Sequence, residues 1–390
     1  MTVWSKCTIG DVLTLQRGFD ITKATQRDGS IPVVSSSGIN SFHDEAKVSG
    51  PGVVIGRKGT LGTCFYLPGP YWPHDTALWV KDFKGNDPKF CYYFLQAMDL
   101  AVHDVGAANP TLNRNHVHLL PAVRPPLDTQ RRIAAILGAY DDLIEVNRRR
   151  VAVLEEMARS LFDEWFVRFR FPGHESVPMI DTPNGPLPQG WSMAAMADVA
   201  HVNRASLRPK ASPDRIGYID IASVSPGRID AVTDMAFEDA PGRARRVVKD
   251  GSILWSNVRP NRRSHALVLS PDDNTIASTG FTVLDAHALP FSFLYQWVTT
   301  EDFVGYLVGN ATGSAYPAVT ATTFERANVL VPTSDAADRY ADFAEPLLRQ
   351  GYALLAANER LAASRDLLLP RLISGQLSVE RAEKELEMAA

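Results

Sequence analysis

The glycine-bracketed stretch GRKGTLG (56–62) is the segment whose residue types come nearest to catalytic chemistry. It contains the glycines and the lysine of a phosphate-binding loop, but not in the order Gly-x-x-x-x-Gly-Lys-Ser/Thr. The stretch Glu45-Ala46-Lys47 matches half of a nuclease motif, and no Pro-Asp pair precedes it at a useful distance. His116 and His118 have no Cys or carboxylate nearby that would complete a metal site. The sequence therefore predicts a binding protein with no catalytic residues and no metal.

The loops carry residues that suit contact with DNA. Arg57 and Lys58 lie between Gly56 and Gly59, where the missing Cβ atoms permit tight curvature and close approach to a ligand. Arg can bridge two acceptors on guanine, Asn can pair with the edge of adenine, and both side chains also contact phosphate. A second region of the same character holds Asn257, Arg259, Asn261, Arg262 and Arg263.

Three further residues, Thr60, Asn113 and Arg114, complete the set of candidate DNA-binding residues. Residues 201–270 contain twelve Arg and Lys against seven Asp and Glu, so positive charge is concentrated there although the whole chain has a net charge of −4. Any DNA binding must therefore come from local patches. The alternative is that these cations form an ordinary solvated face.

The chain repeats itself. Gly106 corresponds to Gly313 and Pro125 to Pro332, both at an offset of 207 residues. In each half, a short β-like run, a basic Gly- or Pro-punctuated loop and a second β-like run precede an aromatic stretch with helical character. A long helical segment follows in both halves. The repeat predicts two copies of a unit made of a mixed, β-rich domain and a long helix.

The long helices must position these loops. Apolar residues of the first segment recur at alternating steps of four and three, and residues 129–165 would span about 55 Å as a helix. Asn147 interrupts this stripe, and Asn358 occupies the matching place in the second segment. We expect the two stripes to pair, with both amides buried and fixing the register. The alternative is that Asn147 faces solvent beside a bend.

Composition adds broad limits. The chain of 390 residues is long enough for two or three domains. It has no apolar run of membrane-spanning length and no signal-peptide core, so neither a membrane nor export is expected. The three cysteines, Cys7, Cys64 and Cys91, lack metal-type spacing. These features favour a reduced, cytoplasmic compartment.

Residues 127–173 resemble the central helical region of the specificity subunits of type I restriction–modification systems. The stretch LPQGW (187–191) resembles the entry to their second recognition domain, and LLLPRLISGQLS (367–378) resembles their C-terminal end. Residues 110–134 resemble the passage from the first recognition domain into the first spacer. The resemblance extends over essentially the whole chain.

The resemblance implies an α+β fold with two mixed α/β, β-rich target recognition domains, separated by two long antiparallel coiled-coil-like helices in a tandem repeat. The expected boundaries are 1–127 for the first recognition domain, 128–170 for the first spacer helix, 171–190 for a Pro/Gly linker, 191–333 for the second recognition domain, 334–377 for the second spacer helix and 378–390 for a C-terminal tail.

The implied function is to read a bipartite, asymmetric site on double-stranded DNA, with one recognition domain for each half-site. The implied partners are two modification (methyltransferase) subunits and, through them, restriction subunits. The chain itself binds no cofactor, because S-adenosylmethionine belongs to the modification subunit, and ATP and Mg to the restriction subunit. Two alternatives are a non-catalytic adaptor with two protein-binding heads and a self-sufficient DNA enzyme.

The first long helix ends in a group of aromatic residues that includes Trp165, Phe166 and Phe169. We expect some of them to form a docking surface for a modification subunit, because large exposed aromatics mark interaction sites. The alternative is that they pack onto their own domain.

Overall fold

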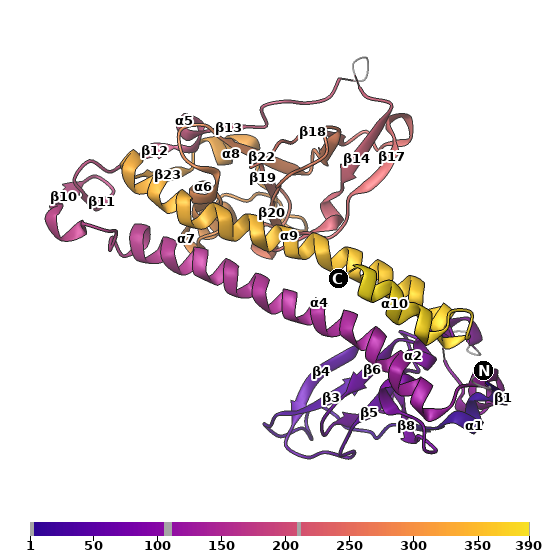
Figure 1. The fold of residues 1–390 in the computed structure, drawn as a ribbon. Coiled ribbons are helices and arrows are strands. Elements are labelled where there is room, and N and C mark those ends of the chain that lie inside the picture. The colour runs from indigo at the N-terminus through magenta and orange to yellow at the C-terminus, as the bar shows by residue number, and fades with distance from the viewer. Residues whose placement is uncertain (1–3, 105–110, 209–211, 390) are drawn as a thin grey trace. The chain divides into compact units, whose positions relative to one another are not determined.

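The computed structural model describes residues 4–104, 111–208 and 212–389. The chain forms two compact units, the first made of residues 1–147 and 357–390 and the second of residues 148–356 (Figure 1). Both long helices pass from one unit into the other, so the division differs from the expected boundaries, which place each long helix in a segment of its own. None of the helices in the described ranges is both long and apolar enough to cross a membrane.

The first unit contains an antiparallel pair of strands and two larger sheets. The pair joins β1 (Ser5–Thr8) to β9 (Pro121–Arg124), and α1 (Ile9–Val12) follows β1. One sheet is antiparallel, in the order β2 (Thr14–Arg17), β8 (Ala77–Asp82), β5 (Gly52–Gly56) and β6 (Cys64–Leu67). The other has the order β4 (Gly38–His43), β3 (Ile31–Ser35) and β7 (Trp72–Pro73), in which β3 and β7 are parallel.

Helices cover the antiparallel sheet of the first unit. They are α2 (Pro88–Gln96), the 3-10 helix η1 (Leu100–His103), α3 (Arg114–Leu119), the first part of α4 (Leu127–Phe162), the last part of α9 (Ser334–Ile373) and α10 (Val379–Ala389). The apolar run Val53–Ile55 of β5 is fully buried. Val53 and Ile55 share a core cluster with Phe90 and Phe94 of α2, Ile133 of α4 and Leu372 of α9, whereas Val54 belongs to a second cluster with Val34 and Tyr71. Figure 1 shows α2 beside α4 in this unit. A central strand buried on both faces explains why its sequence is a continuous apolar run and not an alternating one.

The second unit has a closely similar plan. Strand β12 (Ser192–Ala195) pairs with β23 (Asn328–Val331), and α5 (Met196–Val199) follows β12. The antiparallel sheet has the order β13 (Ala200–Val202), β22 (Phe281–Ala286), β19 (Ile253–Ser256) and β20 (His265–Leu267). The other large sheet has the order β17 (Thr233–Ala236), β14 (Arg215–Ile219), β21 (Thr275–Ser278) and β18 (Ala244–Val247), in which β14 and β21 are parallel.

The second unit also contains short elements. They are β10 (Met179–Thr182), β11 (Gly185–Pro188), β15 (Val224–Ser225), β16 (Arg228–Ile229), α6 (Phe291–Val298), α7 (Glu301–Gly309), α8 (Ala321–Glu325) and the 3-10 helices His174–Ser176, Ile221–Ser223, Phe237–Asp239 and Pro260–Arg262. Strands β10 and β11 form a hairpin inside residues 171–190, the expected linker. Phe171 and Leu187 from this segment are buried in the core of the second unit.

The long helices differ in detail from the expected ones. The α-helical part of α4 ends at Phe162, and one π-helical turn (Asp163–Val167) follows it. Helix α9 ends at Ile373, and residues 379–389 of the expected tail form α10. A turn between α9 and α10 allows Arg132 of α4 to form ion pairs with Glu380 and Glu383 of α10, at 2.7 and 2.6 Å.

Within each unit, α4 and α9 run antiparallel. In the first unit, Asn147 bonds to Asn358, and Asp141 forms an ion pair of 2.5 Å with Arg365, so rising residue numbers on one helix meet falling numbers on the other. In the second unit, the Tyr340 hydroxyl donates to the carbonyl of Ala158 at 3.1 Å.

Candidate nucleic-acid interface

The loop after β5 is held by backbone hydrogen bonds on two sides. The amides of Arg57 and Lys58 both donate to the carbonyl of Thr76, at 3.1 and 3.0 Å. The carbonyl of Arg57 accepts from the amide of Leu112 at 2.9 Å. These bonds place the Arg57–Lys58 loop between the start of β8 and the segment that leads into α3.

Two glycines of this loop have roles that a side chain would disturb. A Cβ atom at Gly56 would lie 2.0 Å from the carbonyl oxygen of Thr60, which is far below a normal contact distance. Gly59 has a φ of +77°, in the left-handed region that favours glycine. The predicted tight curvature is therefore present.

The loop contributes to a cationic surface. Arg57 lies partly buried, and its Nη1 donates to the carbonyl of Asp75 at 3.3 Å. Burial and the neighbouring Arg17 guanidinium lower the pKa of Arg57 from its ordinary value, although an arginine remains charged. A cavity of about 290 Å³ is bordered by Arg17, Arg57, Asn113 and Arg114. Two or more guanidinium groups around one opening can attract a phosphate.

The remaining candidates of the first unit have unequal roles. Lys58, Thr60 and Arg114 are exposed, and neither cation forms an ion pair with another described residue. Asn113 instead caps α3, because its Oδ1 accepts from the amide of Asn115 at 2.9 Å. This hydrogen bond uses one acceptor of the side chain and fixes its orientation, so we interpret Asn113 as a structural residue at the edge of the surface.

The corresponding loop of the second unit follows β19. The amide of Asn257 donates to the carbonyl of Gly280 at 2.8 Å, and its carbonyl accepts from the amide of Val319 at 2.9 Å. The Asn257 side chain is engaged as well, since its Oδ1 accepts from the Thr282 hydroxyl at 2.7 Å. Asn257 thus occupies the same backbone position as Arg57 in the first unit.

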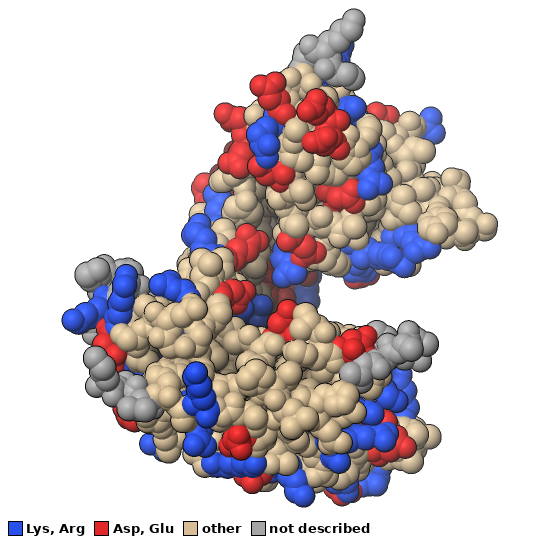
Figure 2. Space-filling view, turned by 90° about the vertical axis from the view of Figure 1, so that its right-hand side faces the viewer, with Lys and Arg blue, Asp and Glu red and all other residues tan. Residues whose placement is uncertain are grey.

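The cations after Asn257 divide into held and free side chains. Arg259 lies over the ring of the exposed Tyr316, 4.6 Å from its centroid, and its Nη2 donates to the carbonyl of Ala315 at 3.3 Å. Arg263 forms an ion pair with Glu301. Asn261 and Arg262 are exposed, and Arg262 forms no ion pair within the described part of the chain. Figure 2 shows that Lys and Arg gather in groups on the surface of each unit, among Asp and Glu.

The aromatic residues at the end of α4 are not a docking surface. Trp165 and Phe166 are 7% and 2% exposed, in the core of the second unit. Phe166 packs against Trp191, Phe293 and Tyr340, with ring centroids 4.8 to 5.6 Å apart. Phe169 is partly buried against Trp191. These rings therefore pack onto their own domain, which agrees with the alternative expectation.

Both asparagines of the long helices are buried in the first unit, Asn147 at 4% and Asn358 at 9% exposure. Nδ2 of Asn147 donates to Oδ1 of Asn358 at 2.9 Å, and Nδ2 of Asn358 donates to the carbonyl of Ile144 at 3.3 Å. Gly106, used above to align the repeat, lies outside the described residues.

Sequence reasoning missed Arg17, Lys81 and Tyr316. Arg17 and Lys81 border a second surface cavity of about 610 Å³ beside Arg114. Both lie at strand positions far from the basic loop in sequence, so no local pattern connects them to it. For Tyr316 the available signal was an aromatic residue within the stretch GSAYP (313–317), whose exposure is known only from the structure.

Comparison with known proteins finds related specificity subunits. Residues 1–156 match the type I restriction modification DNA specificity domain. The chain is 22% identical to the type I restriction enzyme MjaIX specificity subunit of Methanocaldococcus jannaschii over 312 residues, which cover 75% of this chain and 69% of that protein. It is 28% identical to the HindI specificity subunit of Haemophilus influenzae over 116 residues, which cover 28% of this chain and 25% of that protein.

A solved structure agrees in fold. The crystal structure of the type I restriction–modification S subunit from M. genitalium superposes with a TM-score of 0.61 and 15% identity, over 95% of this chain and 96% of that one. At this identity the likeness concerns the fold, with its mixture of strands and long helices. Together with the matching specificity domain, it confirms the resemblance seen in the sequence. The chain is thus similar to type I restriction–modification specificity subunits, through the specificity domain matched in residues 1–156, through the aligned relatives and through the shared fold.

Proposed function

We propose that the chain recognises a bipartite, asymmetric DNA site, with one unit for each half-site, as part of a type I restriction–modification complex. The observation that carries this proposal is the equivalence of the two basic loops. Arg57 and Asn257 make matching backbone hydrogen bonds, to Thr76 and Leu112 in one unit and to Gly280 and Val319 in the other. The same backbone frame presents different side chains, which is what reading two different half-sites requires.

Other features support a repeat with two heads. In both units the antiparallel sheets follow the same order of equivalent strands, and each second sheet contains one parallel pair, β3 with β7 or β14 with β21. The second unit adds β18 to that sheet. The units therefore share a plan and differ in the side chains of the basic loop and in the edge strand β18.

We propose that α4 and α9 together act as a spacer that sets the gap between the half-sites. Their antiparallel pairing in each unit supports this role. The chain contributes no catalytic residue, and it holds two modification subunits and, through them, restriction subunits. S-adenosylmethionine then belongs to the modification subunit, and ATP and Mg to the restriction subunit.

The test is to coexpress the chain with its modification subunit and to map methylated bases in the host DNA. We expect one bipartite motif with an unread gap, which disappears when the specificity chain is omitted. The isolated chain, given S-adenosylmethionine and DNA, should methylate nothing. A modification subunit that is active with another specificity chain but yields no motif with this one would refute the proposal and favour the adaptor alternative.

A matched deletion tests the spacer. Removing seven residues from both α4 and α9 at the Asn147 and Asn358 level shortens each helix by about 10 Å at 1.5 Å per residue. If the helices set the gap, it should shorten by about three base pairs at 3.4 Å each, while both half-sites stay the same. An unchanged gap would exclude the spacer role.

A further inference from the structure

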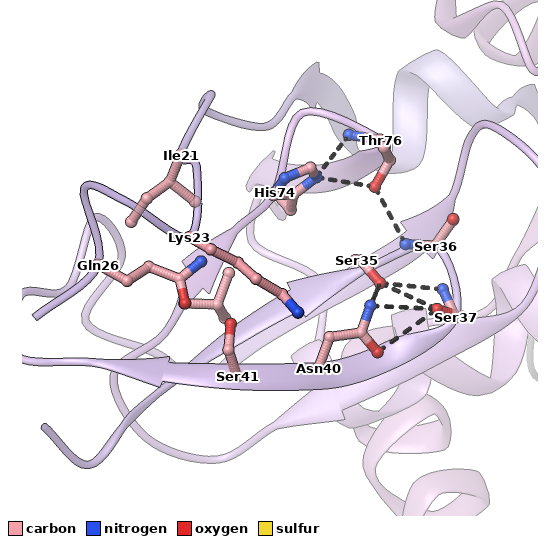
Figure 3. Close-up of a pocket in the computed structure, with 11 residues that line it drawn as sticks. Ile21, Lys23, Gln26, Ser35, Ser36, Ser37, Asn40, Ser41, His74 and Thr76 are labelled. Carbon is pink, nitrogen blue, oxygen red and sulfur yellow. Dashed lines mark hydrogen bonds between the residues drawn. The ribbon is translucent and has the colours of Figure 1, made fainter. Parts of the chain in front are cut away.

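A polar pocket lies beside the basic loop of the first unit. Its volume is about 400 Å³, and its walls come from the β3–β4 hairpin, the loop that contains Ile21 and Gln26, and residues 74–76 (Figure 3). Most of its polar groups are uncharged hydroxyls and amides, from Gln26, Ser35, Ser37, Asn40, Ser41 and Thr76. Among the described residues that line the pocket, Lys23 is the only lysine or arginine.

Hydrogen bonds hold part of the pocket rigid. Nδ2 of Asn40 donates to the hydroxyls of Ser35 at 2.6 Å and Ser37 at 3.3 Å, which ties the two strands of the hairpin at its turn. On the opposite wall, Nδ1 of His74 accepts from the amide of Thr76 at 3.2 Å. A rigid wall costs little ordering entropy when a ligand binds, so these bonds favour a recognition site.

Other groups on the pocket lack a hydrogen-bond partner among the described residues. The side-chain amide of Gln26, the hydroxyl of Ser41 and the amine of Lys23 make no hydrogen bond or ion pair with any residue in the described ranges. Figure 3 shows Lys23, Gln26 and Ser41 on the same side of the pocket, across from His74 and Thr76. Gln26 is only partly exposed, so its amide lies at the pocket wall and not in open solvent.

The pocket and the basic loop share a wall. The carbonyl of Thr76 accepts from the amides of Arg57 and Lys58, and the hydroxyl of the same residue lies 3.4 Å from the amide of Ser36 in the hairpin turn. A nucleic-acid backbone bound by Arg57 and Lys58 would therefore bring its bases close to the pocket.

We propose that this pocket reads a base edge of the first half-site, with Gln26 as the specificity-determining residue and Lys23 on an adjacent phosphate. The proposal rests on the proposed function. Amides and hydroxyls match the donors and acceptors of base edges, whereas phosphate sites depend on cations. A free Gln amide can form two hydrogen bonds with adenine, so an adenine is the expected base.

The second unit differs at the equivalent place. Asp220 directly follows β14, and extending the register of β14 with β21 by one residue aligns Asp220 with Ser35 of the first unit. Asp220 forms an ion pair of 2.5 Å with Arg243, so a charged pair stands where the first unit has the uncharged Ser35. The pocket therefore serves the first half-site alone.

The experiment compares Gln26→Ala, Gln26→Glu and the control Gln376→Ala in the full complex with the modification subunit, by mapping methylated sites. Gln376 is an exposed glutamine of the same unit between α9 and α10. We expect Gln26→Ala to reduce discrimination at one base pair of the first half-site by roughly 5- to 100-fold. Gln26→Glu should shift the preference at that same pair, because the carboxylate accepts hydrogen bonds and donates none.

In both Gln26 variants, the second half-site and the gap should stay the same as in the unaltered chain. The Gln376→Ala control should yield the same complete methylated motif as the unaltered chain. If both Gln26 variants methylate the unaltered motif, the pocket assignment is overturned while the proposed function stands. If the unaltered chain itself yields no bipartite motif, the proposed function fails and the pocket assignment fails with it. Thermal unfolding of each variant, expected to be unchanged, shows that a change of motif does not come from misfolding.

Discussion

The buried amide pair of the long helices gives a quantitative prediction. Asn147 and Asn358 are almost fully buried and bond to each other at 2.9 Å. Replacing either with Leu leaves the partner amide in an apolar setting, where an unsatisfied polar group costs about 1–3 kcal/mol. Asn358→Leu also removes the bond to the carbonyl of Ile144, so it should be the more destabilising of the two.

The double variant should behave differently. With both amides replaced by Leu, no unsatisfied side chain remains, and burial of two apolar side chains offsets the lost hydrogen bond. We therefore expect the free energy of unfolding to lie near that of the unaltered chain. The coupling energy between the two substitutions should then nearly equal the sum of the two single losses, about 2–6 kcal/mol, whose lower part lies within the range seen for residues in direct contact.

Urea denaturation of the four proteins, followed by circular dichroism and tryptophan fluorescence, measures this cycle. Asn115→Leu provides a control, because Asn115 is exposed and should change the free energy of unfolding by less than about 0.5 kcal/mol. If the effects of the single substitutions add to within about 0.5 kcal/mol, the two amides are not coupled and the reasoning is refuted.

Three further predictions concern the core, pH and DNA. Phe166→Ala should lower the free energy of unfolding by about 3–5 kcal/mol, seen as a lower melting temperature, because this ring is buried against other aromatic rings that include Trp191, Phe293 and Tyr340. An unaltered melting temperature would contradict the packing. Burial and the cations Arg159 and Arg263 lower the pKa of His265 to about 4. The unfolded chain therefore binds a proton at His265 more tightly than the folded chain does. The contribution of His265 to the free energy of unfolding should be complete above pH 6.5 and should fall by up to about 3 kcal/mol towards pH 4. His265→Gln should flatten the dependence of the free energy of unfolding on pH, measured by denaturation at several pH values. An equal slope in both proteins would show that His265 is not the group responsible. Lys58→Ala and Arg262→Ala should each weaken DNA binding to a similar extent at all sequences, measured by fluorescence anisotropy. Each should also reduce the slope of log affinity against log salt concentration by about 0.9 per lost phosphate contact. An unchanged slope would show that the residue does not contact DNA phosphates.

Much of the architecture was predictable because it depends on local patterns. The apolar run of β5 marks a strand buried on both faces, and the four-three spacing marks the long helices, since each pattern reports which face is covered. The glycines at 56 and 59 indicate a tight loop because only the missing Cβ permits that backbone. Asn147 and Asn358 stand out as polar residues within otherwise apolar stripes.

Tertiary structure alone decided what lies around these elements. The rings at the end of α4 are equally consistent with docking and with burial until Trp191, Phe293 and Tyr340 are placed against Phe166. The polar pocket combines side chains from segments up to 55 residues apart, from Ile21 to Thr76, and no one of those segments carries a recognisable motif. Sequence patterns report whether a side chain is covered, whereas the identity of the group that covers it depends on chain segments brought together only by folding.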